Sequence, residues 1–231
     1  MSPRTLARLT AAFSLFTLIG GVVAQGFIAN ALVSPRDAAL TATNILGQRQ
    51  LYLLGFTIFL VEMASNIATV TLFYVLLRPV NRTAALVSLV FGLVGCTIKT
   101  LARAFYYAPL LILGGADYLN VYSLGQLQAL ALLAIKINNV MAGIALVFLG
   151  VCTIFQGYLI IKSTFLPRLL GVIAVVSGFG WLSYLYPPLG RALFYYLVVV
   201  AMLGLVLTAG WLLVRGVDEQ RWRELSSKTA A

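Results

Sequence analysis

Residues 83–108, TAALVSLVFGLVGCTIKTLARAFYYA, form an apolar run that is long enough to cross a lipid bilayer, for which about 20 residues suffice. Two basic residues, Lys99 and Arg103, lie four positions apart inside this run. Charged side chains are costly in hydrocarbon, so in membrane helices they usually face other protein segments or a water-filled cavity. The run therefore predicts a membrane-spanning helix with one polar side turned toward neighbouring helices.

Five similar runs and the overall composition predict an all-α, polytopic membrane protein. The chain of 231 residues is 61% hydrophobic and 10% charged, with a mean hydropathy of +1.00, whereas a soluble domain is about 25% charged. We expect one transmembrane domain over residues 1–231, built as a six-helix bundle with a short cytoplasmic tail over 216–231. The spans are expected at about 9–33, 51–77, 83–108, 127–161, 166–186 and 192–214.

The segments between the runs carry helix start and stop signals. The residues from Ser34 to Asp37 combine an N-cap serine, a proline at the first helical position and an acid in the first turn, which predicts a short interfacial helix over 35–46. Ser123 and Gln126 form a capping box at the start of the fourth span. Pro109 is expected to kink or end the third span. Charges at helical spacing in the tail predict a short cytoplasmic helix.

The basic residues are divided unevenly between the two sides of the predicted topology. Cytoplasmic segments of membrane proteins carry an excess of Lys and Arg. With the N-terminus inside, three basic residues lie outside and ten inside, while Lys99, Arg103 and Lys136 lie within or near the spans. The outer residues are Arg36, Arg49 and Arg191, and the inner ones are Arg4, Arg8, Arg78, Arg82, Lys162, Arg168, Arg215, Arg221, Arg223 and Lys228. Both termini are therefore expected in the cytoplasm.

The same distribution bears on partners and cofactors. The net charge of +10 would suit nucleic acid, but the charges lie between apolar runs and form no basic patch, so we expect membrane lipids and no nucleic acid as partners. The chain has no His, and its two Cys, Cys96 and Cys152, lie alone in separate runs. These counts argue against His-ligated haem and Cys-rich or His-bound metal sites, so no metal and no cofactor is expected.

Polar residues of several spans are expected at a similar depth. Counted from the nearest cytoplasmic cation at about 1.5 Å per residue, Gln25, Glu62, Lys99 and Tyr184 lie about 24–26 Å into the membrane. The hydrocarbon core is about 30 Å thick, so this layer is expected just below the outer surface. Lys136 and Asn139 are expected higher, near the mouth of a recess.

Helical spacing places these residues on shared faces that are expected to point into the bundle. Glu62, Ser65, Asn66 and Thr69 form one stripe of the second span. Lys136, Asn139 and Gly143 form another on the fourth.

We expect Glu62 to pair with Lys99, because pairing allows both side chains to stay charged away from water. Arg103 and Lys136 then remain as uncompensated cations that could attract a phosphate, carboxylate or sulfate head. A structural alternative is that Arg103 and Lys136 extend to the outer headgroups while the Glu62–Lys99 pair only locks two helices together.

Tyrosines gather on the predicted outer side, among them Tyr106 and Tyr184. An aromatic belt at the headgroup level explains most of them. Their excess over the inner side also fits a vestibule with an amphipathic wall, suited to a ligand with an apolar body and a polar head.

Four stretches resemble a family of bacterial membrane proteins. They are YVLLRPVNR (74–82), QLQALALL (126–133), GYLIIKSTFLPRLLG (157–171) and GWLLVRGV (210–217). They are similar to the domain-of-unknown-function family 4386 of six-helix integral membrane proteins, over nearly the whole chain. The resemblance implies the fold and the bacterial inner membrane, but no activity. Relatives carry an acid near the position of Glu62, but an acid and a His where this chain has Lys136 to Asn139, so a family-wide site is not transferred to these residues.

Our first functional hypothesis is a protein that binds, senses or passes a small anionic, lipid-like amphiphile in an outer-facing polar recess. Glu62 and Lys99 would organise this site, and Arg103 and Lys136 would receive the head. The side chains expected to orient the ligand are Gln25, Asn66, Asn139, Tyr106 and Tyr184.

Two other classes of function stay open. In an intramembrane, metal-free enzyme acting on an apolar or isoprenoid substrate, Glu62 would serve as general acid or base; a Glu62 with no cation within hydrogen-bonding distance would favour this reading. A small-solute transporter would be expected to show a midplane site and inverted repeats, whereas the polar layer here is off-centre. The glycine pairs Gly143, Gly150 and Gly171, Gly178 allow close helix contacts, either within one protomer or in a homo-oligomer.

Overall fold

The computed structural model describes residues 2–230, and within that range the side chains of residues 2–227. Lys228, which we counted among the cytoplasmic cations, lies outside the described side chains. No strand occurs in the described part of the chain, and six helices are long and apolar enough to cross a membrane. The predicted all-α, six-span architecture is therefore confirmed.

The helices agree in order with the predicted spans but extend beyond most of the apolar runs. The first span runs from Pro3 to Leu32 and the fifth from Arg168 to Leu185. Both of these spans are composite. In the first, α1 (Pro3–Gly21) continues into a π-helix, η1 (Val22–Ala29), and then into α2 (Asn30–Leu32). In the fifth, α7 (Arg168–Trp181) continues into a 3₁₀ turn, η3 (Leu182–Leu185). The other spans are α4 (Arg49–Leu77), α5 (Arg82–Ile112), α6 (Leu124–Lys162) and α8 (Pro187–Val214). The helices are longer because backbone hydrogen bonding continues into the flanking segments. Those segments contain charged side chains, so a prediction based on hydropathy leaves them out of the spans.

We predicted that Pro109 would kink or end the third span. It does not end α5 but lies in the last turn of this helix. The helix continues to Ile112, and the carbonyl of Pro109 accepts a hydrogen bond from Leu113 N at 2.9 Å. A proline removes one backbone N–H, and this loss is small where only one more turn follows.

The short helix α3 (Ala38–Gly47) is present, but its cap is Asp37 rather than Ser34. The Asp37 side chain accepts a hydrogen bond from Leu40 N at 2.9 Å. Ser34 instead exchanges backbone hydrogen bonds with the Thr41 hydroxyl. The capping box of α6 is confirmed, since Gln126 Oε1 accepts from Ser123 N at 2.8 Å and Ser123 Oγ accepts from Gln126 N at 3.4 Å.

The chain forms two compact units, and four of the long helices contribute to both. Unit 1 comprises residues up to Leu18, Ala64–Thr97 and the chain from Gly143 onward; unit 2 comprises Ile19–Met63 and Ile98–Ala142. The core of unit 2 is aromatic and aliphatic, with Tyr52, Phe59 and Tyr106 fully buried.

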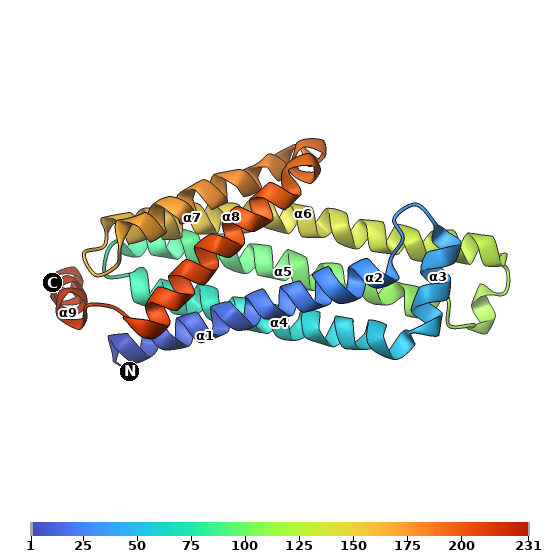
Figure 1. Cartoon of the computed structure of the whole chain (residues 1–231), viewed down its shortest axis with the longest axis horizontal. Helices are drawn as coiled ribbons and strands as arrows, with labels where there is room; N and C mark the ends of the chain where they lie inside the picture. Colours follow the sequence, from blue (N-terminus) through green and yellow to red (C-terminus); the bar gives the residue numbers. More distant parts are fainter. Residues whose placement is uncertain (1, 231) are drawn as a thin grey trace. The chain divides into compact units, whose positions relative to one another are not determined.

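Unit 1 contains an antiparallel contact between α6 and α7 that depends on glycine. A Cβ on Gly157 would lie 2.6 Å from the carbonyl oxygen of Gly171, and a Cβ on Gly150 would lie 2.8 Å from that of Gly178. Three of the four glycines that we singled out therefore serve contacts within one chain, and the fourth, Gly143, faces the Tyr184 ring. From this contact the chain turns through η3 into α8, which runs antiparallel to α7 (Figure 1).

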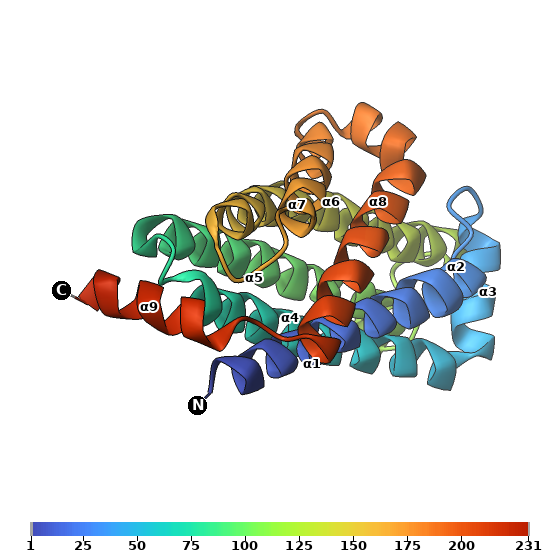
Figure 2. The same cartoon turned by 60° about the vertical axis from the view of Figure 1, so that its left-hand side comes forward.

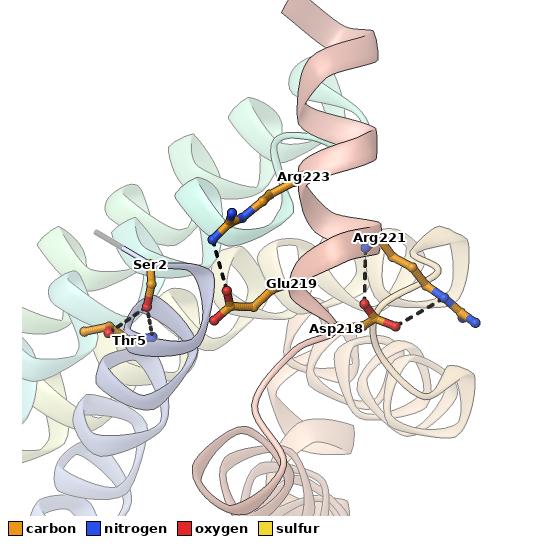
Figure 3. Close-up of polar contacts among 6 residues, drawn as sticks. All are labelled: Ser2, Thr5, Asp218, Glu219, Arg221 and Arg223. Atoms are coloured by element: carbon orange, nitrogen blue, oxygen red, sulfur yellow. Dashed lines mark hydrogen bonds and ion pairs between the residues drawn. The ribbon is translucent and has the colours of Figure 1, made fainter.

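The tail forms the expected helix, α9 (Glu219–Ala230), which packs against the hydrophobic core of unit 1. Asp218 caps it by accepting a hydrogen bond from Arg221 N at 3.1 Å, and Glu219 pairs with Arg223 at 3.2 Å (Figure 3). Trp222 Nε1 donates to the carbonyl of Leu76 at 2.9 Å. Figure 2 shows α9 and the first turns of α1 at the same end of unit 1.

Candidate functional site

The predicted pair of Glu62 and Lys99 is confirmed within unit 2. Lys99 Nζ lies 2.7 Å from Glu62 Oε1, with 19% of the Lys99 side chain and 3% of the Glu62 side chain exposed. Gly20 and Gly21 of α1 lie against Glu62, where a Cβ on Gly20 would be 3.2 Å from Glu62 Cβ. The condition for the enzymatic reading, a Glu62 with no cation within hydrogen-bonding distance, is not met.

Arg103 lies one helical turn beyond Lys99 and is almost fully buried, with 2% of its surface exposed. Its guanidinium carbon lies 3.7 Å from the centroid of the Phe59 ring, and its Nη1 donates to Asn138 Oδ1 at 3.2 Å. A cation over an aromatic face is attracted by the ring quadrupole. Arg103 is thus held by a π face and a neutral amide, and no described carboxylate forms an ion pair with it.

Tyr106 extends the same face of α5 by one further turn. Its ring stacks on Tyr52 with centroids 4.4 Å apart and meets the edge of Phe59 at 5.1 Å. The Tyr52 hydroxyl donates to the Tyr106 carbonyl. Tyr106 thus packs against the ring on which the Arg103 guanidinium lies.

We name Phe59, Glu62, Lys99, Arg103 and Asn138 the buried charge cluster. It contains two cations and one carboxylate, and Glu62 attracts Arg103 electrostatically without forming an ion pair with it. Two of its buried polar atoms, Glu62 Oε2 and Arg103 Nε, have no hydrogen-bond partner among the described residues. A buried polar atom without a partner costs about 1–3 kcal/mol, so the cluster has unused capacity to bind one acceptor and one donor.

Lys136 and Asn139 do not point into the bundle as predicted. Both side chains are exposed, whereas the adjacent Asn138 is buried and donates to Asn139 Oδ1 at 3.0 Å. The neighbouring buried residues Ile135 and Asn138 define the inner face of α6, and Lys136 lies outside it. The predicted stripe was therefore read on the wrong side of this helix.

The other predicted site residues, Gln25, Asn66, Tyr106 and Tyr184, are not members of the buried charge cluster. Gln25 is exposed and donates to Asn30 Oδ1 at 3.3 Å. Asn66 and Tyr184 belong to unit 1, where Tyr184 lies beside Gly143 and Asn66 lines a cavity. Tyr106 contacts Phe59 of the cluster through its ring edge.

Phe59 and Asn138 are functional candidates that the sequence reasoning missed. A repeat of seven marks Asn138, because Ala131, Asn138, Ala145, Cys152 and Leu159 are all buried. Such a repeat identifies one face of a packed helix, but it is recognised from burial, so the sequence alone carried no signal for Asn138.

The residues that the structure describes show no group of three His, Cys, Asp or Glu side chains placed to hold a metal ion. The donor set of the cluster, an amide, a carboxylate and two cations, is suited to an anion instead.

Comparison with known proteins identifies the family. The family model described as "Domain of unknown function (DUF4386)" matches residues 9–216. No curated protein and no solved structure matches the chain. The match covers most of the sequence and all six spans, apart from the first turns of α1. The chain belongs to the DUF4386 family of unknown function.

Proposed function

We propose that this chain is a multi-pass protein of the bacterial cytoplasmic membrane, with both termini inside, that binds the anionic head of a lipid-like amphiphile at the buried charge cluster. The distribution of basic residues supports the orientation, and the family resemblance supports the bacterial membrane. The binding role is argued from the charges of the cluster.

One observation carries the binding role: the guanidinium of Arg103 is buried without an ion-pair partner and with an unpartnered Nε. Burying a charge is costly unless it is paired and hydrogen-bonded. The single carboxylate of Glu62 already accepts from Lys99. An added anion would satisfy Arg103 Nε and balance the second cation.

Access is expected beside Lys99, whose side chain is the most exposed of the charged members. An anionic head could accept hydrogen bonds from Lys99 Nζ and from Arg103 Nε, which lie one turn apart on α5. A ligand that reaches this position from the membrane needs an apolar body, which defines it as an amphiphile.

The test uses dodecyl phosphate, with dodecanol as the uncharged control, added to the purified protein in a neutral detergent. We expect dodecyl phosphate to raise the melting temperature of the wild-type chain and dodecanol to leave it unchanged. Arg103→Gln should lose this shift, and Lys136→Gln, which removes an exposed cation outside the cluster, should keep it.

An equal shift in folded Arg103→Gln would overturn the binding role. Should Arg103→Gln fail to fold, Arg103→Lys keeps the charge but lacks the planar fork and Nε, and it should bind dodecyl phosphate more weakly than the wild type by isothermal titration calorimetry. Equal affinity of Arg103→Lys would also count against the proposal.

A further inference from the structure

Unit 1 contains a cavity of about 200 Å³ that the proposed function does not use. Its walls come from α1, α4, α6, α7 and α8, all through segments of unit 1. We propose that this cavity is a second binding site, and that it takes an uncharged, ring-sized group bearing hydroxyl or carbonyl oxygens, as in phenols and quinones.

The lining of the cavity is polar but carries no charge. No Lys, Arg, Asp or Glu is among the described residues that line it. Hydroxyl and amide side chains instead alternate with apolar ones such as Val70, Phe73 and Trp181. A charged ligand would be buried there without a counter-ion, which is strongly unfavourable, so the lining selects for an uncharged ligand.

The lining hydroxyls that hydrogen-bond their own helices can serve only as acceptors toward a ligand. Ser14 Oγ donates to the Thr10 carbonyl at 2.7 Å, and Thr153 Oγ1 donates to that of Leu149 at 2.8 Å. Thr69 does the same toward Ser65 at 2.9 Å. A ligand hydroxyl could donate to the oxygens of these side chains.

Other lining groups have hydrogen-bonding capacity that the described residues do not use. The Asn66 amide and the Ser177 hydroxyl form no hydrogen bond with a described residue, and the Gln156 amide uses only its Nε2, toward Cys152 Sγ at 3.3 Å. Asn66 alone supplies two donors and one acceptor. These groups could bind a ligand carbonyl or hydroxyl, so the cavity has both donors and acceptors to offer.

The size of the cavity limits the ligand to a compact group. A dry cavity of about 150 Å³ in another protein holds benzene. About 200 Å³ therefore accommodates a substituted six-membered ring, and the apolar walls contact its faces. Water is the competing occupant, and the experiment includes it as an outcome.

The test compares three fluorinated rings of similar size, measured by ¹⁹F NMR line broadening against the chain in nanodiscs, with empty nanodiscs as the reference. We expect 4-fluorophenol to bind. 4-Fluorotoluene, which lacks the hydroxyl, should bind about tenfold more weakly. 4-Fluorobenzoate should not bind, because its carboxylate would be buried without a cation.

Two variants locate the site. Ala174→Leu fills the cavity from α7 and should abolish 4-fluorophenol binding, whereas Asn66→Leu removes the amide at similar size and should weaken binding about tenfold. Lys136→Gln serves as the matched control, because Lys136 does not line the cavity. If Ala174→Leu does not fold, Asn66→Leu decides the question alone.

Two outcomes would overturn the proposal. Equal binding of 4-fluorophenol and 4-fluorotoluene, or unchanged binding in Asn66→Leu, would mean that the polar lining holds water only. The outcome is independent of the anion test, because the probes and the altered residues differ: failure of dodecyl phosphate to bind leaves this proposal standing, and the reverse holds as well.

Discussion

Lys99 Nζ lies 2.7 Å from Glu62 Oε1, at a point where only 3% of the Glu62 side chain is exposed. Removing one partner of a buried ion pair leaves an uncompensated charge and costs about 3–5 kcal/mol. Because Lys99 is partly exposed, we expect Glu62→Gln to lower the free energy of unfolding by an amount at the lower end of this range.

The double variant Glu62→Gln, Lys99→Gln should recover part of that loss, since it removes both charges. Unfolding in a mixed detergent and denaturant titration gives the comparison. Lys136→Gln, an exposed cation of the same unit, should change stability by less than about 0.5 kcal/mol. If the double variant were no more stable than Glu62→Gln, the ion pair would not be the source of the loss.

The contact between Arg103 and Phe59 predicts an energetic coupling between the two positions. A desolvated cation–π contact is worth about 2 kcal/mol. In a double-mutant cycle of Arg103→Met and Phe59→Leu, we therefore expect a coupling energy of about 1–2 kcal/mol from melting curves. A coupling near zero would show that the guanidinium gains nothing from the ring.

Much of the fold could be predicted from apolar run length alone, because a hydrocarbon layer imposes one helix length on every span. The Glu62–Lys99 pair could be predicted too, since each charge required a partner and the chain offers few carboxylates. The N-cap of α3 could not, because Ser34 and Asp37 are both good caps, and in the structure the Ser34 backbone bonds to the Thr41 hydroxyl while Asp37 caps the helix.

The direction of Lys136 could not be read from its local spacing. Lys136, Asn139 and Gly143 fit one helical stripe, and Asn138 fits a different stripe equally well. Because Asn138 and Asn139 are adjacent, their side chains differ in direction by about 100° around the helix. The burial of Asn138 follows from its contact with Arg103, a pairing between α5 and α6. A single sequence carries no information on which side of α6 meets α5.

The contact between α6 and α7 predicts that Gly157 tolerates no side chain. The Cβ of an alanine would lie 2.6 Å from the Gly171 carbonyl oxygen, so the backbones must separate. We expect Gly157→Ala to lower the free energy of unfolding by about 1–3 kcal/mol. The matched control is Gly210→Ala on α8, where the new Cβ meets no atom within 4 Å beyond the chain neighbours and backbone of its own helix; it should be neutral or stabilising by up to about 1 kcal/mol. Equal effects at both glycines would argue against the close contact.

The proposed orientation predicts which ends of the chain react with a membrane-impermeant maleimide. The wild-type chain gives a low background, because Cys96 and Cys152 are both buried. Val121 lies in the connection between α5 and α6 and is 81% exposed, and Ser227 lies exposed in α9. In intact cells we expect Val121→Cys to be labelled at once, and Ser227→Cys only after the membrane is permeabilised. Labelling of Ser227→Cys in intact cells would reverse the topology, and with it the assignment of the ten basic residues to the cytoplasm.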